Sequence, residues 1–133
     1  MKQFDLVVIG AGPGGYVAAI RAAQLGMRVA VVERDKPGGV CVNWGCIPSK
    51  AILTSAILYE EMRNAEAYGI RCQGLSADYG AVIRRSRKVA DRMSRGITFL
   101  FKKNKIELFP AIASVVSPTT VRVGEEELSA KNI

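Results

Sequence analysis

The stretch FDLVVIGAGPGG, residues 4–15, is a short apolar run that ends in a cluster of glycines. β-Branched and apolar residues that stop at glycine are typical of a buried strand in a parallel sheet. The alanine-rich segment 16–25 then favours a helix, which Gly26 would end. Residues 28–33, RVAVVE, predict a second buried strand. The first 33 residues therefore predict a complete βαβ unit.

The glycines have the spacing Gly10-x-Gly12-x-x-Gly15, between a strand and a helix, which is the context that a dinucleotide-binding turn requires. Gly10 allows the tight turn, Gly12 lets a pyrophosphate approach the backbone, and Gly15 lets helix and strand pack closely. Glu33 ends the second strand, where its carboxylate could accept hydrogen bonds from ribose hydroxyls and would repel a 2′-phosphate. The turn alone does not separate FAD from NAD. The alternative is a loop glycine cluster beside a surface glutamate.

The rest of the chain predicts two long helices and a small meander. One helix spans roughly residues 47–68 and stops at Gly69; a connection spans 71–78; a second helix spans about 79–103. The arginines and lysines of the second helix are expected to face outward, opposite an apolar stripe of Val82, Val89, Met93, Ile97 and Leu100. A third strand at 106–109 and a hairpin or meander at 111–116 and 120–123 follow, and residues 131–133 approach one more strand. We predict an α/β, Rossmann-like domain with a central parallel sheet, incomplete at its C-terminal end.

The bulk composition indicates one globular domain of 133 residues, about half of them hydrophobic. No apolar run approaches the roughly 18 residues that span a bilayer, and the N-terminal segment lacks the features of a signal peptide, so we expect no membrane partner and a cytoplasmic location. The net charge of +7 is concentrated between Arg84 and Lys105. Nucleic-acid or membrane-surface binding is one interpretation, but no nucleic-acid motif accompanies the charge, so a solvated helix face is favoured.

Residues 38–50, GGVCVNWGCIPSK, contain the most specific pattern of the chain. Cys41 and Cys46 are separated by four residues, a ring small enough for a disulfide that forms and opens easily. A helix N-terminus and Lys50 would stabilise a thiolate there. Zinc is disfavoured because the chain has no histidine and no second cysteine pair, and we expect no metal. A structural disulfide or two inert thiols remain alternatives, and Cys72 has no partner in the sequence.

This segment, behind the glycine turn and Glu33, resembles the active-site signature of the pyridine-nucleotide-disulfide oxidoreductases. The segment Ile47-Pro48-Ser49-Lys50 is similar to that of the dihydrolipoamide dehydrogenase and mercuric reductase branches, while glutathione reductases tend to differ before the lysine. Val40 and Trp44 depart from the commonest letters of the signature, and Ala111-x-Ala113 replaces a more glycine-rich pair. The resemblance covers essentially the whole chain but only about the first third of a typical family member. It implies that residues 1–133 are the N-terminal part of an FAD-binding domain, with the NAD-binding and interface domains absent.

The resemblance also implies roles for individual residues. Cys41 would be the interchange thiol that meets substrate, and Cys46 the thiol beside the flavin. Lys50 would lie near the flavin N5, and its carboxylate partner would lie beyond Ile133. FAD would be bound by the following residues: Gly10, Gly12, Pro13, Gly14, Gly15, Glu33, Arg34, Gly39, Val40, Cys41, Cys46, Lys50 and Ala113.

The implied reaction oxidises dihydrolipoamide through the Cys41–Cys46 disulfide and FAD, with NAD as the final acceptor. The substrate would be a lipoyl group or a small disulfide, and the complete enzyme would be a homodimer that can belong to a 2-oxoacid dehydrogenase complex. The chain alone is expected to lack full turnover. The alternatives are a mercuric or glutathione-type reductase, or a non-catalytic dinucleotide-binding thiol module. Nucleic acid is not expected as a partner.

Overall fold

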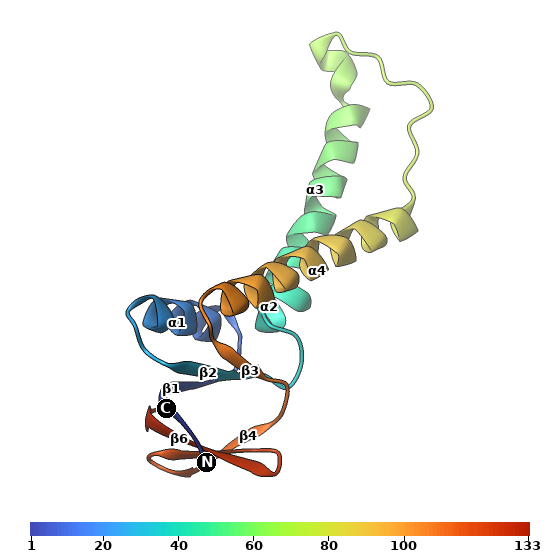
Figure 1. The fold of residues 1–133 in the computed structure, drawn as a ribbon. Coiled ribbons are helices and arrows are strands. Elements are labelled where there is room, and N and C mark those ends of the chain that lie inside the picture. The colour runs from blue at the N-terminus through green and yellow to red at the C-terminus, as the bar shows by residue number, and fades with distance from the viewer.

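The structure is a computed structural model that describes all residues from 1 to 133 (Figure 1). Six strands and four α-helices follow one another with one short 3-10 turn, η1. In chain order the elements are β1 (Lys2–Ile9), α1 (Pro13–Gln24), β2 (Val29–Val32), α2 (Gly39–Asn43), α3 (Cys46–Arg63), η1 (Ala65–Tyr68), α4 (Tyr79–Lys103), β3 (Glu107–Phe109), β4 (Ala113–Ser117), β5 (Thr120–Val123) and β6 (Glu126–Asn132). The predicted α/β class, βαβ unit, two long helices and meander are confirmed.

All six strands belong to one sheet, with the order β3-β2-β1-β6-β5-β4. The strands β3, β2, β1 and β6 are parallel neighbours, whereas β6, β5 and β4 form an antiparallel meander. In Figure 1 the meander lies below β1 and β2, on the side away from α1 and α4. The sheet is therefore the predicted parallel sheet with the meander as its extension.

The strand β6 corrects the expectation that a further strand only begins near residue 131. It starts at Glu126 and pairs with β1 from Lys2↔Leu128 onward. From Glu127 onward its side chains alternate in the manner of a strand with one buried face: Leu128 and Ala130 are buried, whereas Glu127 and Ser129 are half-buried and Lys131 is exposed. Three successive glutamates, 125–127, concealed the strand in the sequence, because glutamate is depleted in strands.

Two buried clusters lie on opposite faces of the parallel strands. Each residue of β2 is buried, and its side chains alternate between the two clusters, as expected for a strand covered on both faces. The helix-side cluster consists of Ala11, Ala19, Ala22, Val29, Val31, Val42, Ile97, Phe101 and Ile106. The meander-side cluster consists of Phe4, Val7, Ala30, Val32, Val121, Val123, Leu128 and Ala130.

The helix α4 has the predicted bounds but a different buried face. Its N-cap, Asp78, accepts a hydrogen bond from the Ala81 N–H at 3.0 Å. Of the predicted stripe, Ile97 is buried, but Met93 and Leu100 are exposed. The buried face is formed by Ser86, Ala90, Ser94, Ile97 and Phe101. The predicted stripe is thus confirmed at Ile97 and partly at Val82 and Val89, which are half-buried, and it is wrong at Met93 and Leu100. The small residues of the buried face, which let two backbones approach closely, were not counted as core positions.

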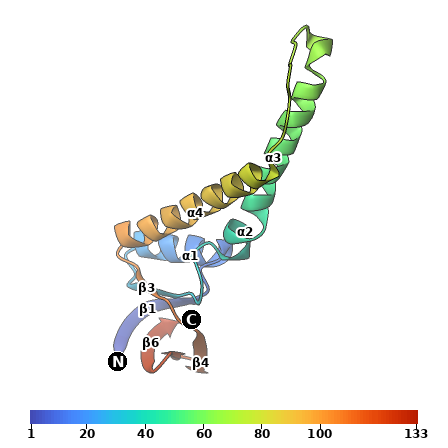
Figure 2. The ribbon, with the colours of Figure 1, turned by 90° about the vertical axis from the view of Figure 1, so that its right-hand side faces the viewer.

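The outer part of α3 projects from the sheet as an arm with η1 at its tip, and the connection 69–78 runs back from the tip to the start of α4 (Figure 2). The predicted helix 47–68 is divided at Asn64, and Gly69 ends η1 in the left-handed conformation at φ 76°. Within α3 only Pro48 and Ala51 are buried, and Leu53, Ile57 and Leu58 are each more than half exposed. Residues 39–63 are long and apolar enough to cross a membrane by length and composition alone, a test that core helices of soluble proteins also pass.

Candidate functional site

The glycine turn joins β1 to α1 with little room for side chains on its inner side. Gly10 has φ +96°, a conformation that glycine adopts without strain. A Cβ on Gly15 would overlap the Gly10 carbonyl oxygen and lie 3.3 Å from Cγ1 of Val8. Gly15 therefore brings the first turn of α1 directly against the strand, the packing that the spacing predicts.

The outer side of the same turn is open. A Cβ on Gly12 or Gly14 would meet nothing within 4 Å. Gly12 is the N-cap of α1, Pro13 follows it, no side chain caps the helix, and the first turn contains no acid. The backbone N–H groups and the positive end of the helix dipole are thus accessible to an anion such as a pyrophosphate.

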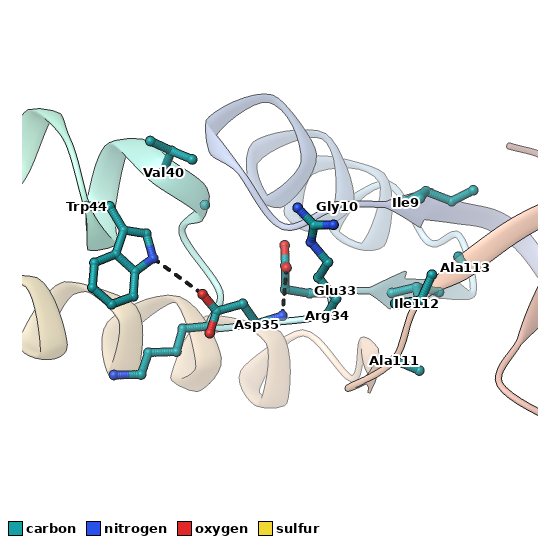
Figure 3. A pocket seen from close by; sticks show the side chains of 13 residues that line it. Ile9, Gly10, Glu33, Arg34, Asp35, Val40, Trp44, Ala111, Ile112 and Ala113 are labelled. Carbon is teal, nitrogen blue, oxygen red and sulfur yellow. Dashed lines mark hydrogen bonds between the residues drawn. The ribbon is translucent and has the colours of Figure 1, made fainter.

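Glu33 lies beside this turn and is oriented by two backbone groups. Its Oε2 accepts a hydrogen bond from the Ala11 N–H at 2.8 Å, and its Oε1 accepts one from the Asp35 N–H at 2.9 Å. The second bond is drawn in Figure 3. Each carboxylate oxygen keeps a further lone pair, so Glu33 can still accept a hydrogen bond from a ligand hydroxyl.

A pocket of about 520 Å³ opens where the carboxyl ends of β1, β2 and β3 meet (Figure 3). Ligands of open α/β sheets bind at this edge. Six of the predicted cofactor-binding residues line the pocket: Gly10, Glu33, Arg34, Gly39, Val40 and Ala113. Seven further lining residues were not predicted: Ile9, Val32, Asp35, Lys36, Trp44, Ala111 and Ile112. All but Trp44 lie at or directly after the ends of these strands, so the carboxyl-end rule could have identified them.

The remaining predicted residues lie outside this pocket. Gly12, Pro13, Gly14 and Gly15 form the turn and the start of α1, and Cys41, Cys46 and Lys50 lie on α2 and α3. The glycine turn and the segment that carries the cysteines nevertheless contact each other at one point. A Cβ on Gly39 would lie 2.7 Å from the Gly12 Cα, and the Gly38 N–H donates to the Ala11 carbonyl at 2.7 Å. The cysteine segment thus begins directly against the glycine turn.

Cys41 lies in α2, and Cys46 is the first residue of α3. Both thiols are free; Cys41 is half-buried and Cys46 is exposed. A hydrogen bond with the Cys46 side chain, followed by burial, raises the pKa of the Cys41 thiol above its usual range. The two thiols lie five residues apart, across the junction of α2 and α3, and the pair can lose two hydrogens to form a disulfide. Cys72 is exposed in the connection before α4, and no group of three or more potential ligands is placed to hold a metal ion.

Lys50 lies one helical turn after Cys46 and is exposed. The Lys50 side chain therefore lies near the N-terminal end of α3, as does the exposed Cys46 thiol, which is what the sequence pattern predicts. Pro48 between them is buried, in the first turn of the helix where proline is tolerated.

Two arginines of α4, which were expected only to face solvent, bond the main chain of neighbouring helices; Arg85 is still exposed, whereas Arg87 is half-buried. Arg85 donates through Nη1 to the Ala51 carbonyl at 2.9 Å, and Arg87 donates through Nη1 to the Asn43 carbonyl at 2.9 Å. These bonds hold α2 and α3 against α4. The sequence could not show them, because both acceptors are main-chain carbonyls, which any residue provides.

Comparison with known proteins relates the chain to one family. Residues 4–133 match the profile of the family described as Pyridine nucleotide-disulphide oxidoreductase. The chain is 50% identical over 136 aligned residues to a dihydrolipoyl dehydrogenase of Zymomonas mobilis, with 98% of this chain and 29% of that protein covered. It is 48% identical over 134 residues to the mitochondrial dihydrolipoyl dehydrogenase of Dictyostelium discoideum, covering 99% of this chain and 28% of that protein. The chain thus spans less than a third of the length of these relatives.

Proposed function

The chain belongs to the pyridine nucleotide-disulphide oxidoreductase family, and from this membership we propose that it forms part of a flavin-dependent dithiol–disulfide oxidoreductase that uses FAD. One observation carries the proposal: the open glycine turn, the Glu33 pocket and the Cys41–Cys46 pair are joined at the Gly39–Gly12 approach. A dinucleotide site and a dithiol thus share one continuous piece of structure. FAD when bound supplies an acceptor for the two electrons of a dithiol.

The residues of the turn and the pocket fit the parts of FAD. The open backbone at Gly12 and Gly14 suits a pyrophosphate, which needs N–H donors and no intervening Cβ. Glu33 presents lone pairs to ribose hydroxyls, and Arg34 lies beside it. Gly39, Val40 and Ala113 would complete the wall around the cofactor. Lys50 would place a positive charge close to the flavin ring and favour its reduced form.

We assign different tasks to the two thiols. Cys41 would exchange with the substrate, and Cys46 would lie beside the flavin. In the exchange, a dihydrolipoyl thiolate attacks one sulfur of the Cys41–Cys46 disulfide; the second thiol of the same substrate then closes a lipoyl disulfide and leaves Cys41 and Cys46 as a dithiol. Two electrons pass from substrate to protein: the protein disulfide bond is broken and the lipoyl disulfide bond is formed. The raised pKa of Cys41 keeps a proton on that thiol once the dithiol has formed.

The substrate assignment relies on the relatives, which are dihydrolipoyl dehydrogenases at 43–50% identity. We therefore propose oxidation of dihydrolipoamide with NAD as the final acceptor. The NAD-binding and interface regions, a homodimer and membership of a 2-oxoacid dehydrogenase complex would belong to the part of the relatives' length that this chain does not span.

Flavin binding is the direct test of the proposal. The chain contains one tryptophan, Trp44, which lines the pocket, so FAD titration can be followed by its fluorescence and by flavin absorbance after gel filtration. We expect stoichiometric binding that Glu33→Gln weakens about tenfold or more, because a hydrogen-bond acceptor at the pocket is lost. Glu126→Gln, an exposed matched substitution on β6, should leave binding unchanged. Absence of flavin binding would leave only the thiol-module alternative.

Substrate choice needs a second measurement. The oxidised chain is mixed with dihydrolipoamide or with dithiothreitol at equal concentration, and free protein thiols are counted over time. Both reductants are dithiols that close a ring, so a faster release of the Cys41 and Cys46 thiols by dihydrolipoamide, which we expect, would report recognition of the lipoyl group. Equal rates for the two reductants would favour a general disulfide reductase.

A further inference from the structure

A Cys41–Cys46 disulfide would close the residues between the two cysteines into a ring, and a side chain of α4 contacts the middle of this segment. The carbonyl oxygen of Asn43, halfway along the ring, accepts the hydrogen bond from Arg87 Nη1 at 2.9 Å. The next residue, Trp44, carries the Arg87 guanidinium over its indole, with Cζ 5.5 Å from the ring centroid. One side chain of α4 thus holds two consecutive residues of the ring.

The same two residues are held from the pocket side. Asn43 is 4% exposed, and its Nδ2 lies 3.1–3.3 Å from the carbonyl oxygens of Lys36, Pro37 and Gly39. The Trp44 Nε1–H donates to Asp35 Oδ2 at 3.3 Å, a bond drawn in Figure 3. The ring is therefore fixed between α4 on one side and the pocket loop 35–39 on the other.

We propose that Arg87 is a positioning residue for the redox pair, which sets the stability of the Cys41–Cys46 disulfide relative to the dithiol. A disulfide requires its two Cβ atoms to lie about 3.5–4.5 Å apart, and closing it costs less when the backbone between the thiols is already ordered. Arg87 orders that backbone through Asn43 and Trp44 without contacting either sulfur. This inference rests on the proposed redox use of the cysteines but not on bound flavin.

Trp44 makes the inference specific to this chain. The indole offers both a ring face to Arg87 and an N–H to Asp35, and these two contacts require an aromatic side chain with a donor. Asp35 and Trp44 also line the pocket. The contacts that fix the ring therefore extend to the wall of the proposed cofactor site.

Arg85 provides a matched control on the same helix. It also donates one Nη1 hydrogen bond of 2.9 Å to a main-chain carbonyl, but the acceptor is Ala51, five residues after Cys46. Loss of Arg85 removes an equivalent contact between α3 and α4 while leaving the ring between the cysteines untouched. A merely structural role for Arg87 therefore predicts the same outcome for both arginines.

The test is the reduction potential of the pair in the flavin-free chain, with Cys72→Ser in every sample. The protein is equilibrated with mixtures of oxidised and reduced glutathione, and the disulfide fraction is counted by alkylation and mass spectrometry. Each protein disulfide formed takes the two thiol hydrogens of Cys41 and Cys46 and converts one oxidised glutathione to two reduced molecules. Circular dichroism checks that each variant is folded.

We expect Arg87→Met to lower the equilibrium constant for disulfide formation about tenfold, equivalent to about 30 mV for this two-electron couple. Arg85→Met should stay within twofold of the parent, and Arg87→Lys, which keeps a charge and one donor, should recover part of the loss. Trp44→Leu, which spares Arg87 itself, should shift the constant in the same direction. Equal shifts for the Arg85 and Arg87 variants, or none for Arg87, would overturn the inference alone. Failure of the parent to form any disulfide would overturn the proposed function as well.

Discussion

The body of the molecule and its arm differ in how completely they bury their apolar side chains. In the body, β1 and β2 are covered by α1 and α4 on one face and by the meander on the other, with a buried cluster on each side. In the arm, which projects away from the body (Figure 2), Leu53, Ile57 and Leu58 of α3 are more than half exposed. Apolar residues recur in both regions, so apolar periodicity alone does not show which surface finds a partner within this chain.

The candidate site lies where these two regions join. Its glycine turn and Glu33 belong to the body, while Cys46 and Lys50 belong to the first turns of the arm helix. Stability of the fold and reactivity of the thiols should therefore respond to different substitutions. The predictions below test that separation.

The largest effect is expected inside the body at Gly15. In Gly15→Val the new side chain would overlap the Gly10 carbonyl, so α1 could not pack on β1 and the cooperative urea transition should disappear. Gly14→Ala, one residue earlier with open space around it, should change the free energy of unfolding by less than about 0.5 kcal/mol. Comparable losses for both variants would show that the turn is not close-packed at Gly15.

A pair of leucine substitutions compares the two regions directly. Leu128→Ala removes a fully buried side chain from β6 and should cost about 2–5 kcal/mol of unfolding free energy. Leu53→Ala removes a side chain that is 58% exposed and should cost less than about 0.5 kcal/mol. Both values come from urea denaturation of the same chain. A costly Leu53→Ala would mean that the arm is covered in solution, for example by a second copy.

A third prediction concerns the thiols at the junction. Because the hydrogen bond with Cys46 is the main cause of the raised pKa of Cys41, Cys46→Ala should lower that pKa and increase the thiolate fraction of Cys41 at pH 8. The rate of Cys41 alkylation by iodoacetamide, followed by mass spectrometry, should rise about threefold or more. Cys72→Ala is the control and should leave this rate unchanged. A slower Cys41 in the Cys46→Ala variant would contradict the assignment.

The smallest effect is expected at an exposed ion pair of the body. The hydrogen bond from Lys131 and then the Arg28 N–H lower the pKa of Asp5 in the folded chain. A lowered folded-state pKa contributes stability above the unfolded value of about 3.9, and this contribution is lost as pH falls through the folded value. Asp5→Asn should therefore reduce the urea midpoint at pH 7 and have little effect near pH 2. Glu61→Gln, an exposed substitution on the arm, should leave the urea midpoint at pH 7 unchanged.

Some elements were predictable from the sequence because their determinants are local. Strand β1, the glycine turn and helix α4 each carry their own pattern of apolar residues, glycine or a cap, and the structure confirms them. Strand β6 was not predictable in the same way, since its glutamates obscure the alternation and its place beside β1 depends on contacts across the whole chain. The order β3-β2-β1-β6 is a tertiary property that no local window contains.

The candidate site also contains residues that the sequence identifies and residues that only the tertiary structure brings there. The residues Gly10, Glu33, Cys41 and Cys46 are identified by spacing. Asp35, Trp44 and Ile112 reach the pocket because loops meet at the carboxyl edge of the sheet. Arg87 was expected to be solvated and instead bonds a main-chain carbonyl, a partner with no signature in a sequence.

The pairing of β1 with β6 has a consequence for how the protein is made. The strand Lys2–Ile9 leaves the ribosome more than a hundred residues before its neighbour in the sheet, Glu126–Asn132. Until then one edge of β1 offers unpaired backbone groups to any other strand nearby. Contacts this distant in sequence also slow folding. Nascent chains should therefore depend on chaperones during this interval and be released only after the meander has been synthesised.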